Sequence, residues 1–198
     1  MCEHDDVKLV AFVSLTLLGC SGELTNTGPQ DADNPGMSDG PRWADATSGQ
    51  TVSGTLQITA TSSAGGGQYA PRNVVAIWIM GPSGSFVKTI GRWADVRKQH
   101  LVAWGTAAGP DTDAVSGATR QDHATPLTAT WDMTARGGQL VGNGTYTVRM
   151  ESADSNANVA SQNHQGTFTF VKSATAQMQT NLSNGGFSNV SITFTPVP

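Results

Sequence analysis

Charged residues are scarce in this chain, and basic residues do not predominate. Only 13% of its 198 residues are charged, well below the roughly one quarter typical of soluble domains. The formal net charge of −4 leaves no basic surface of the kind that binds nucleic acid or an anionic lipid surface. We therefore expect no nucleic-acid partner.

Cysteine is rare as well, since Cys2 and Cys20 are the only two. The apolar run at residues 9–18 (LVAFVSLTLL) follows Lys8 and has the length of a secretory signal, which is too short to cross a bilayer. With Gly19 and Cys20 behind it, the segment resembles a bacterial lipoprotein signal. That resemblance implies cleavage before Cys20, acylation of its thiol and a lipid anchor in the cell envelope. The alternative is an apolar N-terminal strand or helix with an incidental thiol.

Three parts follow from the composition: a signal at residues 1–19, a tether at 20–49 and a domain at 50–198. The tether is rich in Gly, Pro, Asp and Ser and has too few apolar residues to form a core. The domain alternates apolar and polar residues between Gly-containing turns, which is typical of antiparallel strands. The predicted strands lie at residues 51–60, 73–80, 86–90, 127–133, 145–152, 166–172, 178–182 and 190–194.

One segment has a helical rather than a strand-like spacing. Apolar residues recur every three or four positions over residues 92–104, which predicts a short helix that packs Trp93 and Trp104 onto the sheet. The sequence therefore predicts an all-β domain: a two-sheet antiparallel sandwich, immunoglobulin-like, with one short inserted helix.

Two stretches resemble known proteins. Trp131-Asp132, a Gly-containing turn and Gly144-Thr145-Tyr146 resemble a hairpin in the immunoglobulin-like domain of the flagellar hook-capping protein, which implies architecture only. Residues 113–120 (DAVSGATR) resemble the D-x-x-[ST]-G-A-T site at which bacterial flavin transferases attach FMN to extracytoplasmic redox proteins. From about Thr51 to Phe194, the chain resembles a bacterial periplasmic family of unknown function that is often met near flavin transferases and membrane redox proteins.

The second resemblance implies a cofactor and its site. Thr119 would carry FMN through a phosphoester, and Asp113, Ser116, Gly117 and Ala118 would be the recognition motif. A hydroxyl that enters another protein's active site needs an exposed, pliable loop, and the small residues here suit one. Arg120 is expected to pair with the phosphate.

The sequence thus favours an envelope electron-transfer protein that carries covalent FMN and has no active site of its own. Its expected partners are a flavin transferase, membrane redox proteins or cytochromes, and the membrane. The alternative is a non-catalytic β-sandwich module that binds or scaffolds another envelope protein. The scattered histidines, His123 included, have no metal-ligand spacing, and no G-x-S-x-G elbow supports a hydrolase built from Ser116, His123 and Asp113.

Overall fold

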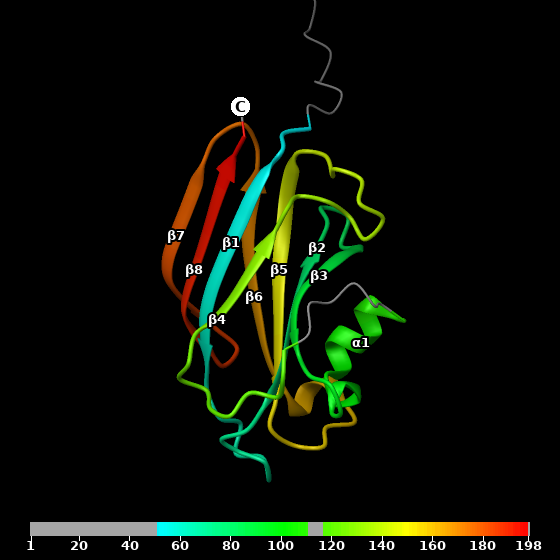
Figure 1. The fold of residues 1–198 in the computed structure, drawn as a ribbon, viewed down its shortest axis with the longest axis vertical. Helices are drawn as coiled ribbons and strands as arrows, with labels where there is room; N and C mark the ends of the chain where they lie inside the picture. Colours follow the sequence, from blue (N-terminus) through cyan, green and yellow to red (C-terminus); the bar gives the residue numbers. More distant parts are fainter. Residues whose placement is uncertain (1–50, 111–116, 198) are drawn as a thin grey trace, which may run out of the picture. The chain divides into compact units, whose positions relative to one another are not determined.

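Two four-stranded antiparallel sheets make up the domain, in a computed structural model that describes residues 51–110 and 117–197 (Figure 1). The first sheet has the strand order β4 (Leu127–Trp131), β1 (Gly54–Ser62), β8 (Phe187–Pro196), β7 (Gln177–Asn184). The second has the order β3 (Phe86–Trp93), β2 (Val74–Met80), β5 (Gly144–Ala153), β6 (His164–Lys172). The predicted two-sheet sandwich is confirmed. The predicted signal, the tether and Cys20 lie outside the described residues.

The main core lies between the sheets and follows from the alternation in the sequence. Leu56, Ile58 and Ala60 on β1 are fully buried, and the residues between them face outwards. An aromatic cluster fills one end of the core, where Trp131 lies 5.3 Å from the Tyr146 ring centre. The Tyr146 hydroxyl donates a 2.7 Å hydrogen bond to the carbonyl of Gly142, the arrangement known as a tyrosine corner in sandwich domains.

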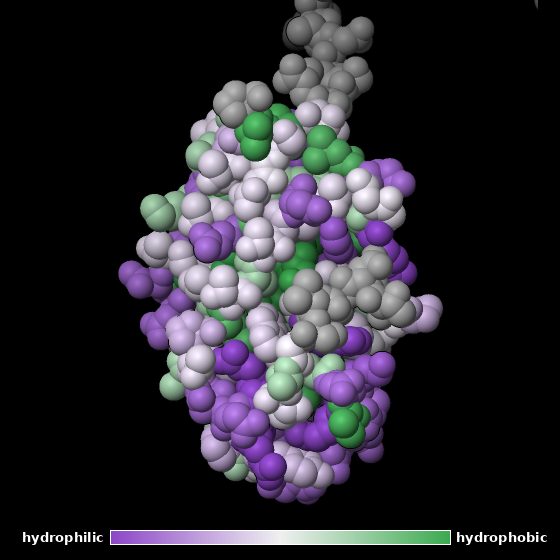
Figure 2. Space-filling model, in the orientation of Figure 1, coloured by the Kyte–Doolittle hydropathy of each residue, from purple (hydrophilic) through white to green (hydrophobic). Residues whose placement is uncertain are grey.

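A second, smaller core covers the outer face of the second sheet. Here Trp78 on β2 packs with Leu101 and Trp104 of the segment around the helix α1 (Val102–Ala108). This layer explains why β2 is buried on both faces. Figure 2 shows that the molecular face it depicts is mostly hydrophilic or neutral, with scattered apolar spots.

The helix predicted at residues 92–104 is wrong in its position. β3 continues to Trp93, which pairs with Val75 of β2, and a 3-10 turn at Lys98–His100 precedes α1. Ladder pairing therefore overrides the helical periodicity at Trp93. The helix starts where Glu151 of β5 accepts hydrogen bonds from the backbone N–H groups of Ala103 (3.0 Å) and Trp104 (2.8 Å).

The predicted hairpin between Trp131 and Tyr146 is not formed either. Trp131 pairs with Leu56 in the first sheet, whereas Tyr146 pairs with Phe170 in the second. The chain between β4 and β5 therefore crosses from one sheet to the other. Asp132 still opens the turn, because its carboxylate accepts hydrogen bonds from the N–H (3.1 Å) and the hydroxyl of Thr134.

None of the helices in residues 51–110 and 117–197 has the length and apolar character needed to cross a membrane.

Candidate functional site

The C-terminal half of the DAVSGATR motif runs along the edge of the second sheet, beside β3. The N–H of Gly117 donates to the carbonyl of Arg92 at 2.8 Å. Three residues further on, Arg120 and Asn73 exchange backbone hydrogen bonds of 2.9 and 3.1 Å, which form an isolated antiparallel bridge just before β2. Thr119 therefore lies on a short segment that is fastened to the sheet at both ends.

Glycine is required at position 117 by a close approach to Trp93. A Cβ atom there would lie 2.5 Å from Cδ1 of the Trp93 indole, which is far inside van der Waals contact. The requirement is thus steric in this chain, in addition to any recognition of the motif by another protein.

Thr119 is half-buried and lines a shallow cavity of about 300 Å³ together with Trp93, Ala118, Arg120, Gln121, Asp122 and Thr125. Gln121 donates to the backbone carbonyl of Thr119 at 3.3 Å, and within the described residues the Thr119 hydroxyl has no hydrogen-bond partner.

Arg120 and Asp122 give this cavity both signs of charge. The Arg120 guanidinium donates to the carbonyl of Thr125 and lies 5.9 Å from the Trp93 ring centre. The Asp122 carboxylate accepts hydrogen bonds from the N–H (2.6 Å) and the hydroxyl (2.9 Å) of Thr125. These hydrogen bonds, helped by the charge of Arg120, lower the pKa of Asp122, so this carboxylate is ionised at neutral pH.

The side chain of Asn73 binds the loop that follows Thr119. Its side chain is fully buried, and its Nδ2 donates at 3.1 Å to the carbonyls of both Pro71 and Asp122. A single buried amide thus links the start of β2 to the loop that follows Thr119.

His123 anchors the same loop through its ring. Its Nδ1 lies 2.9 Å from the hydroxyl of Ser62, and its Nε2 lies 4.0 Å from the Asp154 carboxylate. Burial lowers the pKa of His123, and the nearby charge of Asp154 partly opposes that shift. Asp154 is in turn held by the N–H groups of Gly65 (2.7 Å) and Gly67 (3.1 Å).

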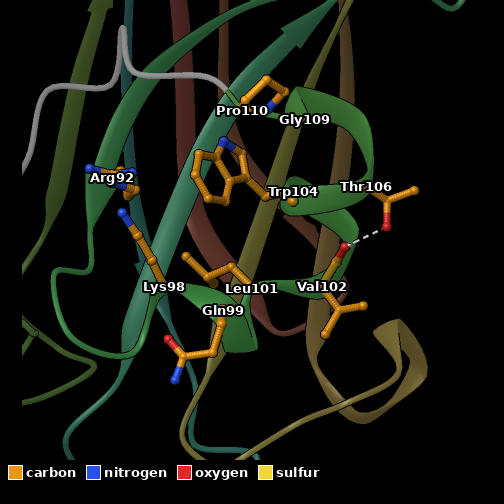
Figure 3. A pocket seen from close by; sticks show the side chains of 10 residues that line it. Arg92, Lys98, Gln99, Leu101, Val102, Trp104, Thr106, Gly109 and Pro110 are labelled. Carbon is orange, nitrogen blue, oxygen red and sulfur yellow. Dashed lines mark hydrogen bonds between the residues drawn. The ribbon is translucent and has the colours of Figure 1, made fainter.

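A larger cavity of about 630 Å³ lies on the other side of β3, against α1 (Figure 3). Its apolar wall consists of Leu101 and the Trp104 indole, and Figure 3 shows the side chains of Arg92 and Lys98 extending to one side of that indole. The indole is fixed because its Nε1 donates to the hydroxyl of Thr89 at 2.9 Å. The cavity therefore combines an ordered aromatic wall with two cationic side chains.

The residues expected at the site divide into two groups. Gly117, Ala118, Thr119 and Arg120 are brought together beside Trp93, whereas Asp113 and Ser116 lie outside the described residues. Sequence reasoning missed Asn73, Asp122 and Asp154, because their roles depend on partners that are distant in the sequence. His123, for which the sequence indicated no metal-ligand role, is largely buried beside Ser62 and Asp154.

The family model of DUF2271, described as a predicted periplasmic protein, matches residues 53–181. The chain belongs to the DUF2271 family. The match begins just before β1 and ends within β7, so it covers most of both sheets of the DUF2271 domain and the segment with Thr119. No curated protein and no solved structure matches the chain.

Within the part of this DUF2271 chain that the structure describes, no three His, Cys, Asp or Glu side chains gather closely enough to hold a metal ion.

Proposed function

We propose that this protein is an extracytoplasmic electron carrier with FMN attached covalently to the Thr119 hydroxyl. The observation that carries the proposal is the motif Asp113-Ala-Val-Ser-Gly-Ala-Thr119, which matches the flavin-transferase acceptor pattern at every specified position. Membership in a family of predicted periplasmic proteins agrees with it, because flavin attachment of this type occurs on proteins outside the cytoplasm.

The surroundings of Thr119 suit an acceptor hydroxyl. The residue lies beside a sheet edge, next to an exposed Ala118 and a glycine that leave a narrow profile for an approaching enzyme. Its hydroxyl has no hydrogen bond to a described residue that would have to break first. The ties at Gly117 and Arg120 make the segment less pliable than the sequence predicted, and the restricted movement lowers the entropy lost when a transferase binds it.

Attachment of FMN to Thr119 is proposed to occur by phosphoryl transfer from FAD. The Thr119 oxygen forms a bond to the phosphorus on the riboflavin side, and the bond from that phosphorus to the bridging oxygen breaks. AMP leaves with the bridging oxygen, and the hydroxyl proton passes to a base of the transferase, whose magnesium offsets charge on the pyrophosphate. The chain itself supplies only the nucleophile.

The residues present also fit the attached group. Arg120 follows Thr119 directly and has five N–H donors, one of which is used on the carbonyl of Thr125, so others can bind the phosphate. FMN, when bound, supplies one- and two-electron redox chemistry, and the protein's part is to position the ring and tune its electrostatics. Membrane redox proteins or cytochromes are the proposed electron partners, and the protein needs no active site of its own.

The proposal includes a membrane tether. Cleavage before Cys20 and acylation of its thiol would hold the domain at the envelope surface through residues 20–49, within reach of membrane redox partners.

The test is co-expression of residues 21–198 with a bacterial flavin transferase and export of the product. We expect the intact mass to rise by one FMN, the added mass to map to the Thr119 peptide, and flavin absorbance to survive denaturation. Thr119→Val removes the hydroxyl at nearly constant volume and should abolish the gain, whereas Thr119→Ser should retain it. Thr125→Val is the matched control, because it changes a neighbouring threonine outside the motif.

An unmodified mass, under conditions in which a known acceptor is fully flavinylated, would overturn the proposal. The chain would then be better described as a β-sandwich module that binds another envelope protein. In that case we expect a pull-down from envelope extracts to recover a partner equally well with wild-type protein and with Thr119→Val.

A further inference from the structure

The two edges of the second sheet differ in how their outward backbone groups are bound. On the β6 edge, backbone groups of alternate residues form hydrogen bonds with amide side chains of β7. The pairs are Thr167 with Asn184 (2.9 Å), Thr169 with Gln179 (2.9 Å) and Val171 with Gln177 (3.0 Å). These side chains occupy the groups that an added strand would need, so the β6 edge is closed.

The opposite edge carries an outward acceptor and an outward donor beside Thr119. Arg120 and Asn73 exchange both backbone hydrogen bonds, so the N–H and the C=O of Arg120 point toward Asn73. In a trans peptide, the C=O of one residue and the N–H of the next point in opposite directions. The carbonyl of Thr119 and the N–H of Gln121 therefore point away from Asn73, to the outer side of the segment.

This outer side is open in the part of the chain that the structure describes. Within residues 51–110 and 117–197, the carbonyl of Thr119 accepts one hydrogen bond, from the side chain of Gln121 at 3.3 Å, and the N–H of Gln121 has no partner. Ala118 and Gln121 are exposed, and the cavity of about 300 Å³ lies along the segment. A free donor and a weakly bound acceptor on a sheet edge are the groups that bind an added β-strand.

We propose that a strand of the flavin transferase adds to the outer side of residues 119–121 while these residues stay on the sheet. This inference rests on the proposed function, and it adds how the partner recognises the site. The transferase strand donates to the carbonyl of Thr119, where it replaces the side chain of Gln121, and accepts from the N–H of Gln121. The backbone of Thr119 is then held on both sides during the transfer to its hydroxyl.

The alternative is that the segment leaves the sheet to enter the transferase. That movement breaks both hydrogen bonds between Arg120 and Asn73, and the 2.8 Å bond from Gly117 to Arg92 as well. Strand addition keeps all three bonds and uses groups that have no other backbone partner. The geometry therefore favours recognition of the segment in place.

The first experiment removes the outward N–H without a change in the motif. Gln121→Pro and Gln121→Ala both lose the side-chain bond to Thr119, but only proline lacks the N–H, so Gln121→Ala is the matched control. We expect kcat/KM for FMN attachment to be about tenfold lower in Gln121→Pro than in Gln121→Ala, the effect of one lost hydrogen bond at an interface. Equal values in the two variants would overturn the proposal.

The second experiment needs no proline and therefore holds even where Gln121→Pro unfolds. Amide hydrogen exchange is measured by NMR in the Thr119→Val domain, saturated with transferase that carries FAD and magnesium. We expect the Gln121 amide to exchange about tenfold more slowly in the complex or slower still, and the Arg120 and Gly117 amides to stay protected. Thr167, on the closed edge, is the control amide and should not change.

Two results of the exchange experiment contradict strand addition. Faster exchange at Arg120 and Gly117 in the complex would show that the segment leaves the sheet. Unchanged exchange at Gln121 would show that its N–H is not bound by the transferase. Intact mass separates this inference from the proposed function, because a wild-type domain that gains no FMN contradicts the function itself, whereas either exchange result with FMN attached overturns strand addition alone.

Discussion

Asn73 and Arg120 form a two-way backbone bridge, with hydrogen bonds of 3.1 and 2.9 Å, between the residue before β2 and the residue after Thr119. This bridge extends the second sheet by one pairing into the loop, which also binds β3 through the hydrogen bond from Gly117 to Arg92. It fixes the backbone on the C-terminal side of the proposed attachment residue and leaves the Thr119 side chain at the surface. The position of Thr119 thus depends on contacts made by its neighbours.

Asn73→Ala should destabilise the domain. The change leaves the carbonyls of Pro71 and Asp122 without their buried amide donor, which we expect to cost about 1–3 kcal/mol in the free energy of unfolding. Urea unfolding followed by tryptophan fluorescence measures the loss. Asn158→Ala, at an exposed position, is the control and should stay within about 0.5 kcal/mol of the wild type. Equal stability of both variants would contradict the anchoring role of Asn73.

Glu151→Ala should loosen the layer formed by α1. Glu151 is fully buried and accepts three hydrogen bonds, from the N–H groups of Ala103 and Trp104 and from Nδ2 of Asn163 at 2.8 Å. Its removal leaves the N–H groups of Ala103 and Trp104 without their acceptor and takes one of the two acceptors from Asn163, and we expect a loss of about 2–4 kcal/mol. Near-ultraviolet circular dichroism should show that Trp104 has lost its fixed environment. An exposed carboxylate, Asp95, provides the comparison, and Asp95→Ala should leave both readouts unchanged.

The strands could be predicted because their signals are local. Leu56, Ile58 and Ala60 alternate with polar residues whatever partner the strand finds, and the alternation alone gives the buried face. The pairing of strands is not local. Trp131 and Tyr146 follow each other in the sequence across a turn, yet they belong to different sheets, because a sandwich permits a connection to cross over as readily as to return.

The segment around Thr119 could be singled out from local sequence alone, because its motif is a short continuous stretch, and flavin attachment there stays a prediction. The start of α1 was not predictable, because its cap comes from Glu151, some fifty residues away in the chain. The steric need for glycine at 117 likewise depends on Trp93, which sequence periodicity had assigned to a helix.

Gly67→Ala should disturb the turn that holds Asp154. A Cβ atom at position 67 would lie 2.3 Å from the Asp154 carboxylate and 2.4 Å from its backbone carbonyl oxygen. Relief of this clash must move backbone as well as side chain, so we expect a loss of about 1–3 kcal/mol. Gly142→Ala, where the added methyl meets nothing within 4 Å, should be neutral or slightly stabilising in the same thermal unfolding assay. Unaltered stability of Gly67→Ala would show that the Asp154 turn is adaptable.

His123 should make the stability of the domain fall in mild acid. Burial lowers the pKa of His123 below its ordinary value of 6.5, against the partial opposition of Asp154, so the unfolded chain binds the proton more readily than the folded one. The free energy of unfolding therefore decreases as the pH falls below about 6.5, and the loss continues until the folded state is protonated too. The carboxylates with lowered pKa values, Asp122 and Asp132, lose their contribution only in stronger acid, below their ordinary value of 3.8.

Thermal unfolding between pH 8 and pH 5 separates these contributions. The wild type should lose stability across this window, and His123→Gln, which keeps a polar group near Ser62 but cannot titrate, should show a flatter profile. Because the backbone of His123 also binds Ser62, with a hydrogen bond of 3.2 Å from the Ser62 N–H to the His123 carbonyl, the variant should retain the fold. If its profile matched that of the wild type, the pH dependence would have to come from another residue.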